Sequence, residues 1–256
     1  MFSDVTIPAG LRFANGREWS AATYKGPGKP ENADGLSAGF EGPLLGFAVA
    51  DGVGVMPASP VASALASTAA TDWVAARNSL TVEDVKALYA AANASVGAGL
   101  KVQGENGATT LVVAVISGGQ AIVASLGDTE VLAVPEEGPA QSLLPRDHHP
   151  TRTNVLLAWL DGVEHFESHA TALGTLPHRL VLATDGVAGT LSVDAIAEIT
   201  RSVPPSEAAM VLVIRARAAG SQDDATAIVI SDHVEEEARE GSDVKVVRLN
   251  SLDGTV

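Results

Sequence analysis

Four aspartates stand at the ends of short apolar runs, where a folded sheet would present their carboxylates at its rim. They are Asp51, Asp128, Asp185 and Asp223. Three of them adjoin a glycine, which lets the backbone approach a ligand closely. Carboxylates gathered at one rim would repel one another. The pattern therefore predicts cations bound between them.

Oxygen ligands of this kind suit Mg²⁺ and Mn²⁺, which are often paired with phosphate substrates. Two such ions about 3.5–4 Å apart can clamp a phosphoryl group and activate a water. The alternative interpretation is that these aspartates belong to ordinary turns, because Asp-Gly is a common turn dipeptide. The aspartates alone leave a metal site and a set of ordinary turns both open.

The elements that would position these aspartates follow from the apolar pattern. Apolar runs predict strands at 44–50, 109–116, 120–128, 129–134, 178–186, 224–230 and, late in the chain, 244–249. Helical spacing predicts helices near 61–73, 80–95, 192–200 and 206–220. Thr81 is placed to cap the second helix with Asp84, and Gly97, Gly99, Gly104 and Gly107 are expected to break its pattern. Residues 1–43, rich in glycine and proline, are expected to be loops.

Predicted strands follow one another in pairs, and predicted helices do the same. A strict alternation of strand and helix is not seen. This order favours a mixed sheet system with helices packed outside it over a doubly wound parallel sheet.

Composition narrows the class of protein. The 256 residues fit one large domain, and the net charge of −15 argues against a partner that is nucleic acid or an anionic membrane. The absence of cysteine excludes disulfides and thiolate metal sites. The first residues do not resemble a signal peptide, so a cytoplasmic protein is expected. The acidic run 235–240 is expected to be a solvated face or tail.

Other chemistry-bearing patterns are weak. No Gly-x-Ser-x-Gly elbow, Walker A loop or EF-hand is present. Asp147 and His148 are interpreted as structural members of a loop. Trp19, Trp73 and Trp159 are expected to serve in packing.

Seven segments, in order along nearly the whole chain, resemble the metal-dependent protein phosphatase family, type 2C. They are ENAD (31–34), FAVADGVG (47–54), GATTLVVAVI (107–116), ASLGDTEVLAV (124–134), RDHHP (146–150), LVLATDGV (180–187) and GSQDDATAIVI (220–230). The order and spacing make the set specific, although each segment alone is weak.

The resemblance implies an α+β fold. The expected architecture is a four-layer α-β-β-α sandwich, in which two central, mostly antiparallel sheets are flanked by helix pairs. The phosphatase domain would span residues 1–231. Residues 232–256 would form an acidic C-terminal extension with an added edge strand.

The resemblance also implies hydrolysis of phosphoserine and phosphothreonine in proteins by in-line attack of a metal-bridging water. Two divalent cations, Mn²⁺ or Mg²⁺, would be the cofactors, with a weaker third ion. The implied metal residues are Asp51 as the bridge, the carbonyl of Gly52, Asp185, Asp223, Asp34 through water, and Asp128 at the third ion. The expected partners are a phosphorylated protein substrate and a cognate Ser/Thr kinase or its target, and a monomer is expected.

Four positions depart from the family pattern. Lys29 stands where an arginine usually holds the substrate phosphate, and Arg17 is an alternative candidate for that role. Ala33, Val55 and Asp224 replace an acidic or amide residue, a glycine and an asparagine. These changes motivate an alternative function, a weakly active or inactive phosphatase-like module that binds a phosphoprotein or regulatory partner. A phosphatase of small metabolites is a third possibility.

Overall fold

The structure is a computed structural model that describes residues 5–6, 17–40, 42–54, 56–149, 151–163, 166–234 and 246–249. Val55 and the acidic run 235–240 lie outside the described residues. Across the described part of the chain, every helix is too short or too polar to cross a bilayer.

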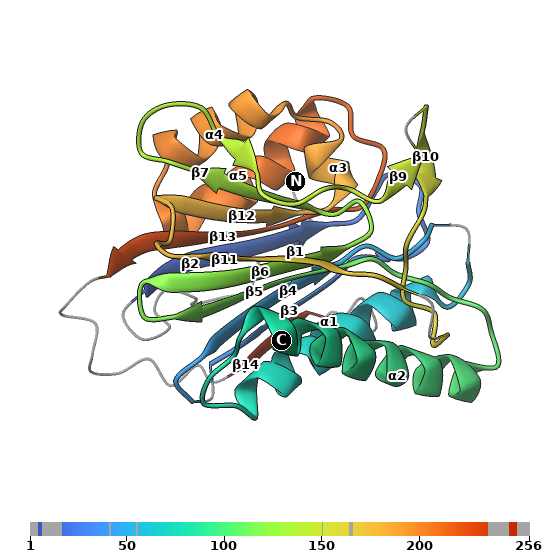
Figure 1. Ribbon diagram of the computed structural model, residues 1–256. Coiled ribbons are helices and arrows are strands. Elements are labelled where there is room, and N and C mark those ends of the chain that lie inside the picture. The colour runs from blue at the N-terminus through green and yellow to red at the C-terminus, as the bar shows by residue number, and fades with distance from the viewer. Residues whose placement is uncertain are drawn as a thin grey trace.

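Two six-stranded antiparallel sheets form the centre of the molecule (Figure 1). The first sheet has the order β1 (Val5–Thr6), β2 (Arg17–Tyr24), β13 (Ala225–Val234), β12 (Arg179–Ala183), β7 (Glu130–Val134) and β8 (Gln141–Ser142). The second has the order β11 (His169–Leu173), β6 (Gln120–Leu126), β5 (Leu111–Ser117), β4 (Leu45–Ala50), β3 (Gly35–Gly39) and β14 (Val246–Leu249). A separate small hairpin joins β9 (His148–His149) to β10 (Arg152–Leu156).

Helices cover the outer face of each sheet. The second sheet carries α1 (Ser59–Ala75) and α2 (Val85–Gln103), which follows the short 3₁₀ helix η1 (Val82–Asp84). The first sheet carries α4 (Val193–Ser202) and α5 (Pro205–Ala218), with the single turn α3 (Asp185–Ala188) at the end of β12. The four-layer α-β-β-α sandwich is therefore confirmed.

The space between the sheets is filled by large apolar side chains. Trp19, Phe40 and Phe47 form an aromatic cluster with ring centroids 5.2–5.6 Å apart. Leu180 of β12 and Ile228 of β13 belong to the same buried cluster. The expectation that Trp19 serves in packing is confirmed, because aromatic side chains contribute most of their energy through such burial.

The expectation that residues 1–43 are loops is wrong for the described part, because β2 and β3 lie within it. Their small residues look like loop residues in the sequence, but they serve close packing. A Cβ at Gly35 would lie 2.5 Å from the carbonyl oxygen of Ser63 on α1. Only glycine lets β3 approach the helix this closely.

The prediction that glycines break the second helix is wrong for Gly97 and Gly99 and confirmed for Gly104. α2 continues to Gln103 and ends at Gly104, whose φ of 70° is the left-handed cap typical of glycine. A Cβ at Gly97 would lie 2.8 Å from the Cα of Gly162, so this glycine permits contact between backbones. The capping contact between Thr81 and Asp84 is confirmed, with the Thr81 N–H donating to Asp84 over 2.8 Å.

Two strands bear on the predicted division at residue 231. β13 continues to Val234, three residues past that position. β14 pairs antiparallel with β3, at the edge of the second sheet. The boundary between a phosphatase domain and an extension stays a prediction.

Replacing Phe47 with alanine tests the core between the sheets. The ring is fully buried and contacts two other aromatic rings, so Phe47→Ala should lower the free energy of unfolding by about 3–5 kcal/mol. Urea unfolding followed by circular dichroism measures this value. The exposed Val102→Ala is the matched control and should change it by less than about 0.5 kcal/mol. Equal effects of the two variants would contradict the assigned core.

Candidate functional site

Both sheets end at the same rim of the sandwich, and this rim carries the predicted aspartates. In the second sheet, Gly35 at the start of β3 pairs with Ala50 at the end of β4. Asp34 and Asp51 therefore adjoin one another across that pair. In the first sheet, β12 ends just before Asp185, and its partner β13 begins just after Asp223.

A buried carboxylate connects the two sheets at this rim. Asp34, beside β3, accepts hydrogen bonds on Oδ2 from the hydroxyls of Thr184 (2.9 Å) and Thr226 (2.7 Å). Both threonines belong to the first sheet or its strand ends, whereas Asp34 belongs to the second. The contacts fix the relative position of the aspartates contributed by each sheet.

Burial and neighbouring charges both act on the carboxylates of the rim. Burial, followed by the negative charges of Asp34, Asp185, Asp128 and Asp223, raises the pKa of Asp51 well above its usual value. Burial, followed by the charges of Asp223 and Asp128, raises the pKa of Asp185 to about 6, against a usual 3.8. The charges of the other four aspartates that sequence reasoning singled out thus all act on Asp51, although no three of the described carboxylates converge on one point.

Asp34 and Asp128 respond to different surroundings. Burial, then the charge of Asp224, raises the pKa of Asp34 well above its usual value, although the two threonine hydrogen bonds oppose the rise. Burial also raises the pKa of Asp128, while its own backbone and the nearby Arg146 and His148 oppose it. Asp128 lies in the turn between β6 and β7.

The backbone of Asp51 is held by two threonines that follow Gly107-Ala108. Its N–H donates to the hydroxyl of Thr110 over 2.9 Å. Its carbonyl accepts from the N–H of Thr110 and from the hydroxyl of Thr109, each over 2.9 Å. Sequence reasoning assigned no role to these threonines or to Thr184 and Thr226. Their place beside the aspartate segments was the available signal.

Glycine is required after two of the aspartates. A Cβ at Gly52 would lie 2.5 Å from the carbonyl oxygen of Ala33, and its N–H donates to that oxygen over 3.1 Å. A Cβ at Gly186 would lie 1.8 Å from the carbonyl oxygen of Asp224. The Asp-Gly dipeptides are thus close-packing positions, not free turns.

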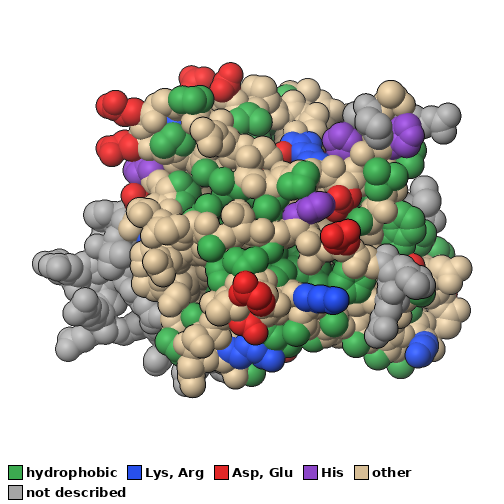
Figure 2. All heavy atoms as spheres, in the orientation of Figure 1, with side chains coloured by type: hydrophobic (Ala, Val, Ile, Leu, Met, Phe, Trp, Pro, Cys, Tyr) green, Lys and Arg blue, Asp and Glu red, His purple; other side chains and the backbone are tan. Residues whose placement is uncertain are grey.

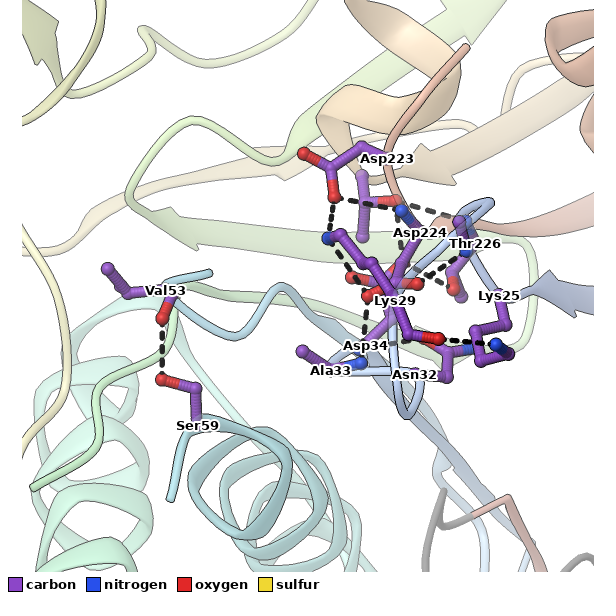
Figure 3. A network of polar contacts seen from close by, with 12 residues as sticks. Lys25, Lys29, Asn32, Ala33, Asp34, Val53, Ser59, Asp223, Asp224 and Thr226 are labelled. Atoms are coloured by element: carbon purple, nitrogen blue, oxygen red, sulfur yellow. Dashed lines mark hydrogen bonds and ion pairs between the residues drawn. The ribbon is translucent and has the colours of Figure 1, made fainter. Parts of the chain in front are cut away.

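Lys29 reaches the cluster from the loop between β2 and β3 (Figure 3). Its ammonium group pairs with Asp223 and, over 3.1 Å, with Asp224. Burial disfavours the charge on Lys29, but hydrogen bonds and charges from Asp223 and Asp224 outweigh it and raise the pKa of the ammonium group. The alternative that Arg17 reaches the site is wrong. Arg17 starts β2 at the far end and donates to backbone carbonyls of Ser231 and Gly118, each over 2.8 Å.

Asp224 faces inward, which the sequence left undecided. Its buried carboxylate accepts from the N–H of Gly26 over 2.7 Å and from the N–H of Ala33 over 2.9 Å, besides pairing with Lys29. It thereby holds both ends of the loop that carries Lys29 (Figure 3). Ala33 contributes through its backbone, and its side chain brings no ligand atom.

Asp147 has the structural role expected of it. One carboxylate oxygen accepts from the N–H of Gly127 over 3.0 Å, and the other pairs with His169 Nε2 over 2.8 Å. These contacts fix the turn that precedes Asp128.

The donor set fits hydrated divalent cations. Oδ1 of Asp34 and Oδ1 of Asp185 are buried without a hydrogen-bond partner, so each has an unused acceptor position. Among the described residues, no three His, Cys, Asp or Glu side chains converge on one point that an ion could occupy. Mg²⁺ and similar hard cations usually bind one or two carboxylates and keep several waters. Such ions suit dispersed, mutually repelling carboxylates.

Comparisons with known proteins agree with the geometry. A family model described as protein phosphatase 2C matches residues 32–218. The match includes Asp34, Asp51, Asp128 and Asp185 but ends before Asp223 and begins after Lys29. No curated protein sequence matches the chain significantly.

Solved structures of bacterial phosphatases share the fold. The Mycobacterium tuberculosis serine/threonine phosphatase PstP/Ppp is 24% identical, with a TM-score of 0.72 over 84% of this chain and 98% of that one. The catalytic domain of PstP in complex with two manganese ions is 22% identical, with a TM-score of 0.71 over 84% and 97%. Stp1 from Staphylococcus aureus is 15% identical, with a TM-score of 0.75 over 88% and 98%.

The raised pKa of Asp185 predicts a pH dependence of stability. Between its unfolded value of 3.8 and its folded value of about 6, the folded protein binds more protons than the unfolded chain. The stability contributed by this group therefore falls as the pH rises from 4 to 6. In the presence of chelator, the thermal unfolding midpoint of the wild type minus that of Asp185→Asn should decrease as the pH rises across that window. A constant difference between the two proteins would contradict the assignment.

Replacing Asp224 with alanine should loosen the loop that carries Lys29. The change leaves the N–H groups of Gly26 and Ala33 without their acceptor, so the free energy of unfolding should fall by about 2–4 kcal/mol. Chemical unfolding measures the change, and the exposed Glu136→Ala is a control expected to stay within about 0.5 kcal/mol. A value for Asp224→Ala as small as the control's would mean that the loop is held by other contacts.

Proposed function

Because the chain belongs to the protein phosphatase 2C family, we propose that it hydrolyses phosphoserine and phosphothreonine in proteins with the help of divalent cations at the aspartate rim. Membership makes the protein a serine/threonine phosphatase. The observation that carries the proposal for the site is geometric: Asp34, beside Asp51 in the second sheet, bonds to Thr184 and Thr226, which adjoin Asp185 and Asp223 in the first. Burial, followed by neighbouring negative charges, raises the pKa of Asp34, Asp51 and Asp185. Buried carboxylates that repel one another are costly unless cations compensate them.

The residues that would hold the cations are those of the rim. The set comprises Asp51, the carbonyl of Gly52, Asp185, Asp223, Asp34 through water, and Asp128 for a weaker third ion. Bound Mn²⁺ or Mg²⁺ would polarise the phosphoryl oxygens and supply an activated water for in-line attack. The two manganese ions in the PstP structure support Mn²⁺ as the first ion to test.

The substrate phosphoryl group would approach from the side of Asp223. The side chain of Asp223 is 48% exposed, whereas Asp34 is buried at the base of the rim. Lys29 lies beside Asp223, and only two of its three N–H donors are engaged by carboxylates. The third can donate to a phosphoryl oxygen and orient it. Lysine does so as a point charge, without the two parallel contacts of an arginine.

One observation favours the second candidate, a weakly active module that binds a phosphoprotein. The charge of Lys29 is already compensated by Asp223 and Asp224, so it attracts phosphate less than an unpaired cation would. Calorimetry with Mn²⁺ separates the two functions. Cation binding with negligible turnover of phosphopeptides would select the module.

The proposal also covers the setting of the enzyme. The expected partners are a phosphoprotein substrate and a Ser/Thr kinase or its target, without nucleic acid or membrane, and the net charge of −15 supports this restriction. We further propose a cytoplasmic monomer. Light scattering coupled to size-exclusion chromatography tests the monomeric state.

Removing either of two carboxylates should abolish catalysis. Asp51→Asn and Asp223→Asn each remove a negative charge needed to hold cations, so turnover of an aryl phosphate with Mn²⁺ should fall at least about a thousandfold. Chelator should do the same to the wild type. Asp194→Asn, exposed on α4, is the matched control and should retain full activity. Undiminished hydrolysis by Asp51→Asn would refute the assigned site.

Replacing Lys29 should weaken phosphate binding if the new side chain is neutral and should preserve it if the new side chain is positively charged. Lys29→Gln removes a charge-assisted hydrogen bond, so kcat/KM for a phosphothreonine peptide should fall about tenfold to a hundredfold. Lys29→Arg keeps the charge and adds a fork geometry, so it should equal or exceed the wild type. Similar losses in both variants would show that packing around Asp224, not charge, matters at this position.

A further inference from the structure

Exposed large hydrophobic side chains are concentrated in one short segment. Among the described residues five such side chains are exposed, and four of them lie between positions 155 and 163. They are Val155 (38% exposed), Leu157 (57%), Trp159 (38%) and Val163 (55%). We call these four residues the apolar strip. Figure 2 shows hydrophobic side chains at the surface on the side where β10 lies in Figure 1.

Packing of the core does not explain why the exposed side of this segment is apolar. Along 155–160 the exposed residues alternate with more buried ones, and Leu160 faces the core between α2 and the second sheet. A segment with one face in water usually places polar residues on that face. Here the outward face, Val155, Leu157 and Trp159, is apolar too. An apolar row kept in water beside a functional site marks an interaction surface.

Trp159 is held ready for contact. The expectation that it serves in packing stays a prediction, since the residue is 38% exposed and otherwise buried. Its Nε1 donates to the carboxylate of Asp161 over 3.0 Å, which limits the orientations of the ring. A tryptophan fixed in this way loses little conformational entropy on binding and is typical of interface anchors.

The strip borders the aspartate rim through a continuous set of backbone contacts. Leu160 and Thr109 exchange two hydrogen bonds, of 2.8 and 3.0 Å, and Thr109 bridges in turn to Gly52. Two strand spacings separate Leu160 from Gly52, which is about 10 Å. The hydroxyl of Thr109 also binds the carbonyl of Asp51. The strip is therefore fixed relative to the residues proposed to hold the cations.

We propose that the apolar strip docks an apolar side chain of the phosphoprotein substrate, carried within about three to four residues of the phosphorylated residue. This inference rests on the proposed function. An extended peptide advances about 3.3 Å per residue, so about three residues span the distance from rim to strip. The substrate class is thus a polypeptide with a leucine, phenylalanine or similar residue near the phosphothreonine or phosphoserine, and not a small phosphorylated metabolite.

The size of the strip favours a peptide over a second copy of the chain. A stable dimer buries about 800 Å² on each partner. Four side chains, of which none is more than 57% exposed, offer much less than that area. One apolar side chain of a bound peptide matches the strip in size.

The experiment compares two phosphothreonine peptides that differ only at the positions three and four residues from the phosphothreonine, leucine in one and serine in the other. The enzymes are the wild type with Mn²⁺, the double variant Leu157→Ser/Trp159→Ser, and Val102→Ser. The last removes an apolar, 86% exposed side chain near the end of α2 that is not a member of the strip. Turnover of p-nitrophenyl phosphate reports on the catalytic centre in each protein, and circular dichroism reports on folding.

The wild type and Val102→Ser should prefer the leucine peptide in kcat/KM by about tenfold, since burying one such side chain is worth that much. In the double variant this ratio should fall to near one. Equal use of the two peptides by a wild type that hydrolyses p-nitrophenyl phosphate would overturn this inference alone. So would an unchanged ratio in the double variant, or a wild-type dimer that the double variant dissociates. No hydrolysis of any substrate by the wild type would overturn the proposed function itself.

Discussion

The structure depends on one buried carboxylate, that of Asp34, held where the two sheets meet. It is the acceptor for hydroxyls of Thr184 and Thr226, which come from the opposite sheet. A buried charge is tolerated only where hydrogen bonds or other charges compensate it. Burial, followed by the charge of this same carboxylate, raises the pKa of Asp51. Joining the sheets and creating a site that attracts cations are thus two results of one interaction.

The rim also contains its own counter-charge. Lys29 bonds to Asp223 and Asp224, and Asp224 binds the backbone at both ends of the loop that carries Lys29. The loop, its lysine and two carboxylates are therefore coupled, and any ligand that engages one of them acts on all. A substrate phosphate at Lys29 has to compete with the two carboxylates that Lys29 already contacts. The presence of lysine at this position therefore affects how strongly the substrate binds.

Close packing of backbones makes this arrangement possible. Gly52 and Gly186 leave no space for a Cβ beside the carbonyls of Ala33 and Asp224, and Gly35 allows β3 to lie against α1. Thr109 extends this framework outward, since it connects Asp51 to the segment that carries the apolar strip. Chemistry at the rim and recognition beside it are therefore positioned by a common framework of β-strand contacts.

The sequence by itself determined the chemical types and their order. Apolar runs that end in Asp-Gly predicted the strands before Asp51 and Asp185, and the family resemblance predicted the four layers. Local pattern could not reveal β2 and β3, because glycine and alanine that pack closely look the same as loop residues. Only the tertiary structure decided that Asp224 faces inward and that Trp159 stays partly exposed. The orientation of such side chains depends on which elements pack against each other in the sandwich, and the spacing of residues along the chain does not specify that packing.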